Sequence, residues 1–210
     1  GTAHSSTAVS AGLGIKAAKD INKDKSKVIC VVGDGALSAG LAFEGLNNAG
    51  ALKKGLIVIL NDNKMSIDKP VGAMSTYLTR LLSSKSYSSL RNIIKKISKT
   101  LPSNFSKTLS RTEEYSKGLI SGGTLFEELG FYYLGPIDGH NIDDMVSVLE
   151  NIRDNKFDKP VFLHCITKKG KGYSPAEKSD DKFHGVEKFD INTGNSIKKS
   201  NLKSYSNVFG

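Results

Sequence analysis

KVICVVGDG (residues 27–35) and GLIVILNDN (residues 55–63) are the two stretches that decide the fold. Each is a run of apolar, mostly β-branched residues that ends in a polar triplet. Runs of this kind are typical of strands in a parallel sheet that are covered on both faces. Residues 36–49 between them have helical spacing, and Gly50 ends that helix. The order predicts a right-handed crossover in an α/β, doubly wound, mostly parallel sheet with helices on both faces.

The alternation of helices and strands continues along the chain. Between residues 70 and 123 the apolar periodicity weakens, which predicts a mobile insertion that covers the site. We expect residues 1–190 to form one domain, with a polar, extended tail from 174, and residues 191–210 to form a linker toward a further domain. Further helices are expected at 5–18, 77–82, 90–97, 124–129 and 142–153, and further strands at 131–134 and 161–166.

The composition indicates a globular protein with one sizeable core, since 38% of the 210 residues are hydrophobic. The longest apolar run is the strand-length segment 56–60, so no membrane span is expected. The amino terminus has neither the basic nor the apolar region of a secretory signal. Cys30 and Cys165 stand in apolar runs, where reduced cysteine acts as a small core residue, so a reducing compartment such as the cytoplasm is expected.

The net charge of +9 fits either a nucleic-acid partner or a lysine-rich surface around an anionic cofactor. The lysines are spread along the chain, and no aromatic residues that could stack on bases alternate with them in the first lysine group. We therefore expect a solvated surface and no nucleic-acid partner.

Asp34 and Asn63 provide oxygen ligands of the kind that Mg²⁺ prefers, a carboxylate and an amide. Each follows a predicted strand, and the intervening helix makes the two strands neighbours. Gly33 and Gly35 flank Asp34, so the backbone can approach a diphosphate closely, and the helix that follows offers free N–H groups. Either triplet alone is also ordinary turn chemistry. Together, in this order, they predict a site for magnesium and a diphosphate.

The two triplets resemble the diphosphate-binding signature of thiamine diphosphate enzymes, which begins Gly-Asp-Gly and ends in paired asparagines. Further segments resemble the 1-deoxy-D-xylulose-5-phosphate synthase family and extend from residue 4 to about residue 190. The resemblance implies a thiamine diphosphate-binding fold that begins here after the family's first strand and helix. The matching segments are HSST (4–7), GDGA (33–36), NDNKMSI (61–67), YSSLR (87–91), RTEE (111–114), GTLFEELG (123–130), DGH (138–140) and TKKGKGY (167–173).

The resemblance also implies the site residues. The metal ligands would be Asp34, Asn63 and the Met65 carbonyl, and His4 would be catalytic. The family usually has glycine where this chain has Ala3. Each assignment has a structural alternative, since His4 can cap a helix, Tyr173 can serve packing alone, and Lys169 can be a solvated lysine. The implied cofactor-binding residues are Ala3, His4, Ser5, Gly35, Ala36, Asn63, Lys169 and Tyr173.

Three other histidines have separate expectations. His164 lies in the predicted strand 161–166 and is expected to be a core histidine with satisfied hydrogen bonds. His140 is expected to brace its loop. His184 resembles a family position near the substrate channel.

The resemblance implies a thiamine diphosphate-dependent transferase that condenses pyruvate with D-glyceraldehyde 3-phosphate, with loss of CO₂. Its product would serve the biosynthesis of isoprenoid precursors, thiamine and pyridoxal. In the family, the catalytic glutamate lies in a following pyrimidine-binding domain, so we expect this chain to be inactive alone. A homodimer is implied, in the cytoplasm or, in a eukaryote, in a plastid.

Two alternatives share the predicted site. The chain could be the diphosphate-binding half of a transketolase-type enzyme, or a non-catalytic module that binds a magnesium diphosphate. The long segment between residues 74 and 123 and the RTEE stretch at 111–114 favour the synthase over a transketolase.

Overall fold

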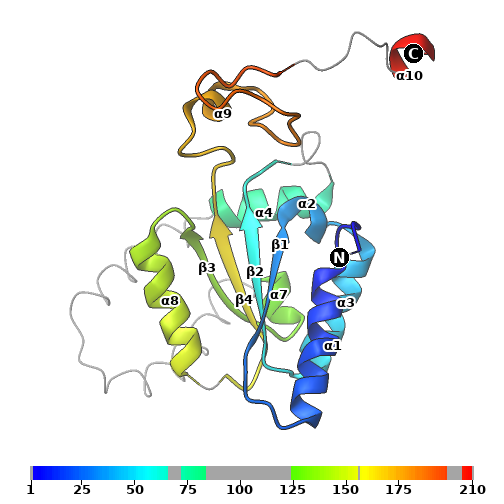
Figure 1. Cartoon of the computed structure of the whole chain (residues 1–210). Coiled ribbons are helices and arrows are strands. Elements are labelled where there is room, and N and C mark those ends of the chain that lie inside the picture. The colour runs from blue at the N-terminus through cyan, green and yellow to red at the C-terminus, as the bar shows by residue number, and fades with distance from the viewer. Residues whose placement is uncertain (1, 66–71, 84–123, 156, 198–204, 210) are drawn as a thin grey trace. The chain divides into compact units, whose positions relative to one another are not determined.

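The described part of the chain forms one parallel sheet with helices packed on it (Figure 1). The computed structural model describes residues 2–65, 72–83, 124–155, 157–197 and 205–209. All three strand pairings are parallel, and the order is β1-β2-β4-β3. The strands are β1 (Val28–Gly33), β2 (Leu56–Asp62), β3 (Tyr132–Asp138) and β4 (Val161–Ile166). The helices are α1 (Ala8–Ile21), α2 (Asp34–Leu37), α3 (Gly40–Leu52), α4 (Ala73–Ser83), α7 (Leu125–Glu128), α8 (Ile142–Asp154), α9 (Ser174–Lys178) and α10 (Tyr205–Phe209).

The direction of the connections explains why the helices lie on both faces of the sheet. The chain moves one way along the sheet from β1 to β2 to β3, and then turns back from β3 to β4. Because crossovers between parallel strands are right-handed, connections in opposite directions place their helices on opposite faces. α3 and the adjacent α1 accordingly lie on one face and α8 on the other (Figure 1). This confirms the predicted α/β class.

Each face of the sheet has its own core. On the face of α1 and α3, the fully buried rings of Phe126 and Phe162 stack with their centroids 3.8 Å apart. On the opposite face, Ile152 of α8 packs with Ile57 and Leu163 from the two central strands. The two central strands, β2 and β4, are therefore buried on both sides, as their continuous apolar runs predict.

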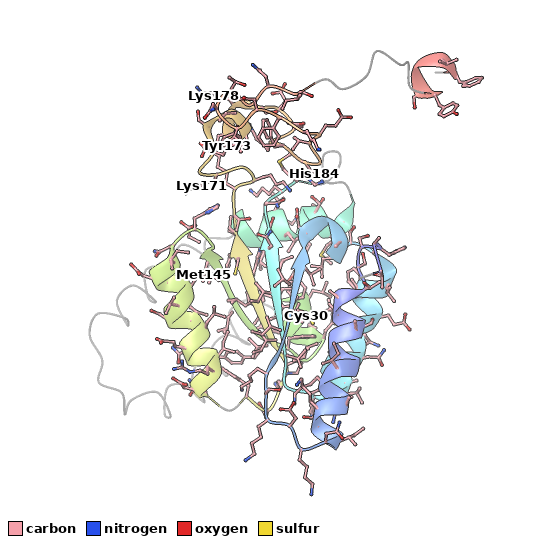
Figure 2. All side chains as sticks on the ribbon, viewed as in Figure 1. Cys30, Met145, Lys171, Tyr173, Lys178 and His184 are labelled. Carbon is pink, nitrogen blue, oxygen red and sulfur yellow. The ribbon has the colours of Figure 1, made fainter. Side chains whose placement is uncertain are left out.

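Helix α1 lies so close to β1 that only glycine fits at position 12. A Cβ atom at Gly12 would overlap Cys30 Sγ. The Cys30 thiol donates to Ala8 O at 3.3 Å (Figure 2). Burial raises the pKa of Cys30, and it raises the pKa of Cys165 to about 11. Both cysteines are buried, as predicted, and neither forms a disulfide.

Several element boundaries differ from the sequence predictions. The helix predicted at 36–49 is two helices, α2 and α3, because Ala39 takes an extended conformation with ψ of 146°. The strand predicted at 131–134 continues to Asp138, with a register irregularity between Leu134 and Ile137. The extended tail predicted from residue 174 is wrong over α9. The helix predicted at 90–97 lies outside the described residues.

The prediction that β1 is covered on both faces is wrong within the part of the chain that the structure describes. β1 is an edge strand, and its outward-facing side chains Ile29 and Val31 are 52% and 64% exposed. Helix α8 packs against β3 at the other end of the sheet. A continuous β-branched run therefore does not distinguish an edge strand from a central one.

The chain forms two compact units, residues 1–167 and 168–210. The first contains the sheet. The second contains α9 and a cluster of the Tyr173, Phe183 and Phe189 rings. The domain boundary predicted at residue 190 and the mobile insertion predicted at 70–123 stay predictions. Of the described helices, none has the length and apolar character of a membrane span.

The contact between α1 and β1 generates a test with a control on the same helix. Gly12→Ala overpacks the core and should destabilise the fold by about 1 to 3 kcal/mol. Gly14→Ala has no atom within 4 Å of the new Cβ, so it should stabilise the fold by about 0.5 to 1 kcal/mol through helix propensity. Urea denaturation measures both changes. Equal effects of the two substitutions would contradict the close approach at Gly12.

Candidate functional site

The candidate site lies at the carboxyl ends of the strands, where ligands bind in open α/β sheets. The register pairs Gly33 of β1 with Asn61 of β2. Asp34 and Asp62 are the next residues, so the two predicted triplets stand side by side. Thr167, directly after β4, joins them: its hydroxyl donates to Asn61 Oδ1 at 2.6 Å, and its N–H donates to Asp62 O at 2.9 Å.

The Asp34 carboxyl group has an unfavourable environment for its charged form. Asp34 is only 9% exposed. Burial raises its pKa above the ordinary value, and the nearby Asp62 carboxylate raises it further. The backbone N–H groups of Gly35 and Asn63 act in the opposite direction. Two carboxyl groups so close together, both of them buried, form a place where a cation would be stabilised.

The turn after β2 contains two of the predicted metal ligands, Asn63 and Met65. The Lys64 N–H donates to Asp62 Oδ1 at 3.3 Å, and the Met65 N–H donates to Asn63 Oδ1 at 2.9 Å. Lys64 takes a left-handed conformation, with φ of 57°. An amide oxygen has two lone pairs, so Asn63 Oδ1 can accept this bond and also contact a cation.

The predicted amino-terminal part of the site is connected to the first triplet by a serine that sequence reasoning did not select. Ser6 Oγ donates to Ala36 O at 2.7 Å, and Ser6 is only 6% exposed. This bond brings His4 and Ser5 close to α2. Both side chains are exposed, and His4 Nδ1 lies 2.7 Å from Ser5 O. Since a carbonyl oxygen only accepts, Nδ1 carries the proton, which leaves Nε2 as the acceptor of a neutral ring.

The other predicted residues have separate positions. Ala3 is exposed and has a left-handed φ of 49°, a conformation that suits the glycine usual in the family. Lys169 and Tyr173 belong to the second unit, and Tyr173 Oη donates to Ile191 O at 2.7 Å there (Figure 2). The structure therefore brings together Asp34, Gly35, Ala36 and the 61–65 turn. The roles of all the site residues stay predictions.

Comparison with known proteins identifies the family. A family model described as 1-deoxy-D-xylulose-5-phosphate synthase matches residues 1–167. The chain belongs to this family. The match covers the whole first unit, including both triplets and the predicted insertion. The expectation drawn from the sequence motifs is thus confirmed at the level of the family.

One solved structure with a similar chain is a transketolase from Campylobacter jejuni subsp. jejuni NCTC 11168. Its TM-score is 0.46 and its sequence is 22% identical over 80% of this chain. The chain spans 20% of the length of that transketolase.

The residues at the strand ends fit a magnesium diphosphate group by their chemistry. Mg²⁺ binds hard oxygen ligands, usually one or two carboxylates with other oxygens. Asp34, the Asn63 amide and the Met65 carbonyl are such a set. No group of three or more His, Cys, Asp or Glu side chains gathers as a metal site among the described residues. The predicted ligand set is of a different kind, because it combines one carboxylate with an amide and a carbonyl.

The raised pKa of Asp34 predicts how pH affects stability. A pKa that is raised on folding contributes stability that is present below the ordinary aspartate pKa and is lost as pH rises through the raised pKa. Without metal ions at neutral pH, Asp34→Asn should therefore raise the free energy of unfolding by about 0.5 to 2 kcal/mol. The gain should disappear in acid below the ordinary aspartate pKa.

A matched control is Asp24→Asn. The ammonium group of Lys19 and the backbone N–H of Ser26 lower the pKa of Asp24, so the sign is reversed. We expect no stabilisation at neutral pH from this substitution. Thermal unfolding across a pH series measures both variants, and a destabilising Asp34→Asn in metal-free buffer would contradict the interpretation.

Proposed function

We propose that this chain binds the magnesium diphosphate end of thiamine diphosphate and is the amino-terminal part of a 1-deoxy-D-xylulose-5-phosphate synthase. The complete enzyme is a transferase that joins pyruvate to D-glyceraldehyde 3-phosphate, releases CO₂ and forms 1-deoxy-D-xylulose 5-phosphate. The observation that carries the proposal is the convergence of Asp34 with the 61–65 turn, in a chain whose first 167 residues match the family.

The electrostatics at the strand ends support a cation site. Ionised Asp34 lies close to Asp62 in a buried position, which is unfavourable without a positive charge nearby. A divalent cation supplies that charge. Asp34, the Asn63 side chain and the Met65 carbonyl would hold the ion, and phosphate oxygens would complete its ligands.

The backbone around Asp34 supports a neighbouring diphosphate. Gly35 and Ala36 lie in the first turn of α2, where N–H groups have no backbone carbonyl partner within the helix. The absent Cβ of Gly35 lets phosphate oxygens approach the backbone. The Ser6 bond to Ala36 O fixes this turn from the side of the amino-terminal segment.

Thiamine diphosphate, when bound, supplies a carbon nucleophile and an electron sink for the decarboxylation. In our proposal this chain orients the cofactor. His4 would hold a proton at Nδ1 and offer Nε2 as an acceptor to a reacting group. Lys169 and Tyr173 would also bind the cofactor, as the family resemblance implies. The catalytic glutamate and the pyrimidine pocket come from a following domain, and the complete enzyme is a homodimer in the cytoplasm or a plastid.

Calorimetry tests the proposal on this chain. Thiamine diphosphate and, separately, inorganic diphosphate are titrated into the chain with Mg²⁺ and with EDTA. We expect binding that requires Mg²⁺. Asp34→Ala removes a buried charged ligand and should weaken binding by about 2 kcal/mol or more, roughly 30-fold in Kd.

Asp24→Ala is the control, since it removes an exposed carboxylate with its own lysine partner. It should leave Kd unchanged. The proposal fails if neither diphosphate binds with Mg²⁺, or if Asp34→Ala and Asp24→Ala bind equally well.

A further inference from the structure

A chain of three polar side chains crosses the core directly beneath the candidate site. Tyr133 Oη of β3 lies 2.9 Å from His164 Nδ1 of β4. His164 Nε2 lies 2.9 Å from Asp62 Oδ2 at the end of β2. His164 is fully buried and Asp62 is 2% exposed. Three neighbouring strands thus contribute one side chain each, and the chain ends at the residue between Asn61 and Asn63.

The direction of the hydrogen bonds follows from the chemistry of the three groups. An aspartate carboxylate only accepts, so His164 Nε2 carries a proton and donates to Asp62. In the neutral ring Nδ1 is then an acceptor, and the Tyr133 hydroxyl donates to it. Each polar atom of this buried chain has a partner, and each partner fixes the rotation of the next group.

Asp62 connects these three side chains to the turn after β2. Its other oxygen, Oδ1, accepts the Lys64 N–H, and its backbone oxygen accepts the Thr167 N–H. Successive side chains of an extended strand point to opposite faces. Because the Asp62 side chain is held in the core, the side chains of Asn61 and Asn63 point to the opposite side of the strand.

Stability alone does not explain why a polar side chain, Asp62, occupies this buried position. An apolar pair of similar volume would often stabilise a core as well as a buried hydrogen-bonded polar pair does, or better. An apolar residue at position 62 could not accept the Lys64 N–H, and it would have no preferred direction toward β4. The polar chain adds orientation, which is what a metal ligand on the next residue requires.

We propose that Tyr133 and His164 are positioning residues that act through Asp62 to hold the Asn63–Met65 turn in the geometry that binds Mg²⁺. The inference rests on the proposed function, since it concerns the same site. Neither residue touches the cofactor or the ion in this proposal. Their effect is to preorganise the turn.

Tyr133→Phe is the sharpest test, because the chain offers a matched control. Tyr133 stacks on Phe126 with a centroid distance of 5.9 Å, and Tyr77 contacts the same ring edge-on at 6.2 Å. Tyr77 Oη accepts the Leu125 N–H at 2.7 Å, a bond unconnected to the turn. Each Tyr→Phe substitution removes one hydroxyl from the same core, and only one of them breaks the chain to Asp62.

The first readout is amide hydrogen exchange at Lys64 and Met65, which needs no cofactor. Tyr133→Phe should speed exchange at these two amides by about 10-fold, and Tyr77→Phe should leave it within about twofold of the wild type. The second readout is the Mg²⁺ concentration for half-saturation at fixed thiamine diphosphate. It should rise about 10-fold in Tyr133→Phe alone.

Two substitutions at His164 separate positioning from packing. His164→Gln places an amide N–H where Nε2 stood, so it keeps the bond to Asp62 but loses the acceptor of the Tyr133 hydroxyl. Its losses of slow exchange and of Mg²⁺ affinity should be no greater than those of Tyr133→Phe. His164→Leu fills the space without a donor and should lose more of both than His164→Gln does. A merely structural histidine would give equal losses for the two variants at equal stability.

The outcomes distinguish this inference from the proposed function. Equal exchange and equal Mg²⁺ dependence in Tyr133→Phe and Tyr77→Phe would overturn the inference while wild-type binding stands. In a second outcome, the wild-type chain fails to bind magnesium diphosphate while Tyr133→Phe still speeds exchange at Lys64 and Met65. That result would overturn the proposed function and leave the positioning of the turn established.

Discussion

The parallel pairing of β1 with β2 is the constraint on which the rest of the site depends. Its register places Gly33 opposite Asn61, so residues that are far apart in the sequence meet at one edge of the sheet. A shift of one residue would turn the side chains of one strand to the opposite face and separate Asp34 from the 61–65 turn. The register is secured from below by the apolar core, in which Leu56, Val58 and Leu60 are fully buried.

The same edge of the sheet concentrates groups that are unfavourable for folding. Asp34, Asp62 and His164 are all buried, while most of the surrounding core is apolar. Such groups persist when their partners are well placed, and they are common where a protein keeps a site ready for a ligand. Here burial and the nearby Asp62 disfavour the charged form of the carboxyl group in the first triplet. The second triplet is held by an ordered set of hydrogen bonds.

Local sequence patterns predicted most of the framework. The run Val161–Ile166 gave a strand with the observed ends, and both glycine-rich and asparagine-rich triplets lie at strand ends as expected. The break near Ala39 was missed because small residues continue the helical spacing across it. The Ser6 bond to Ala36 and the His164 bond to Asp62 join residues 30 and 102 positions apart, so no local pattern contains them. The satisfied state of His164 was predicted, but its partners could not be.

The uncovered side of β1 has a consequence for how the chain behaves in solution. Among the described residues, β1 has no strand on its outer side, and its Ile29 and Val31 side chains are exposed, so this edge is a template on which another strand can pair. The net charge of +9 keeps identical molecules apart, but salt at physiological strength screens that repulsion beyond about 8 Å. Aggregation of the protein therefore depends on long-range charge repulsion and on short-range strand pairing at this edge. Higher ionic strength weakens the repulsion and favours the pairing.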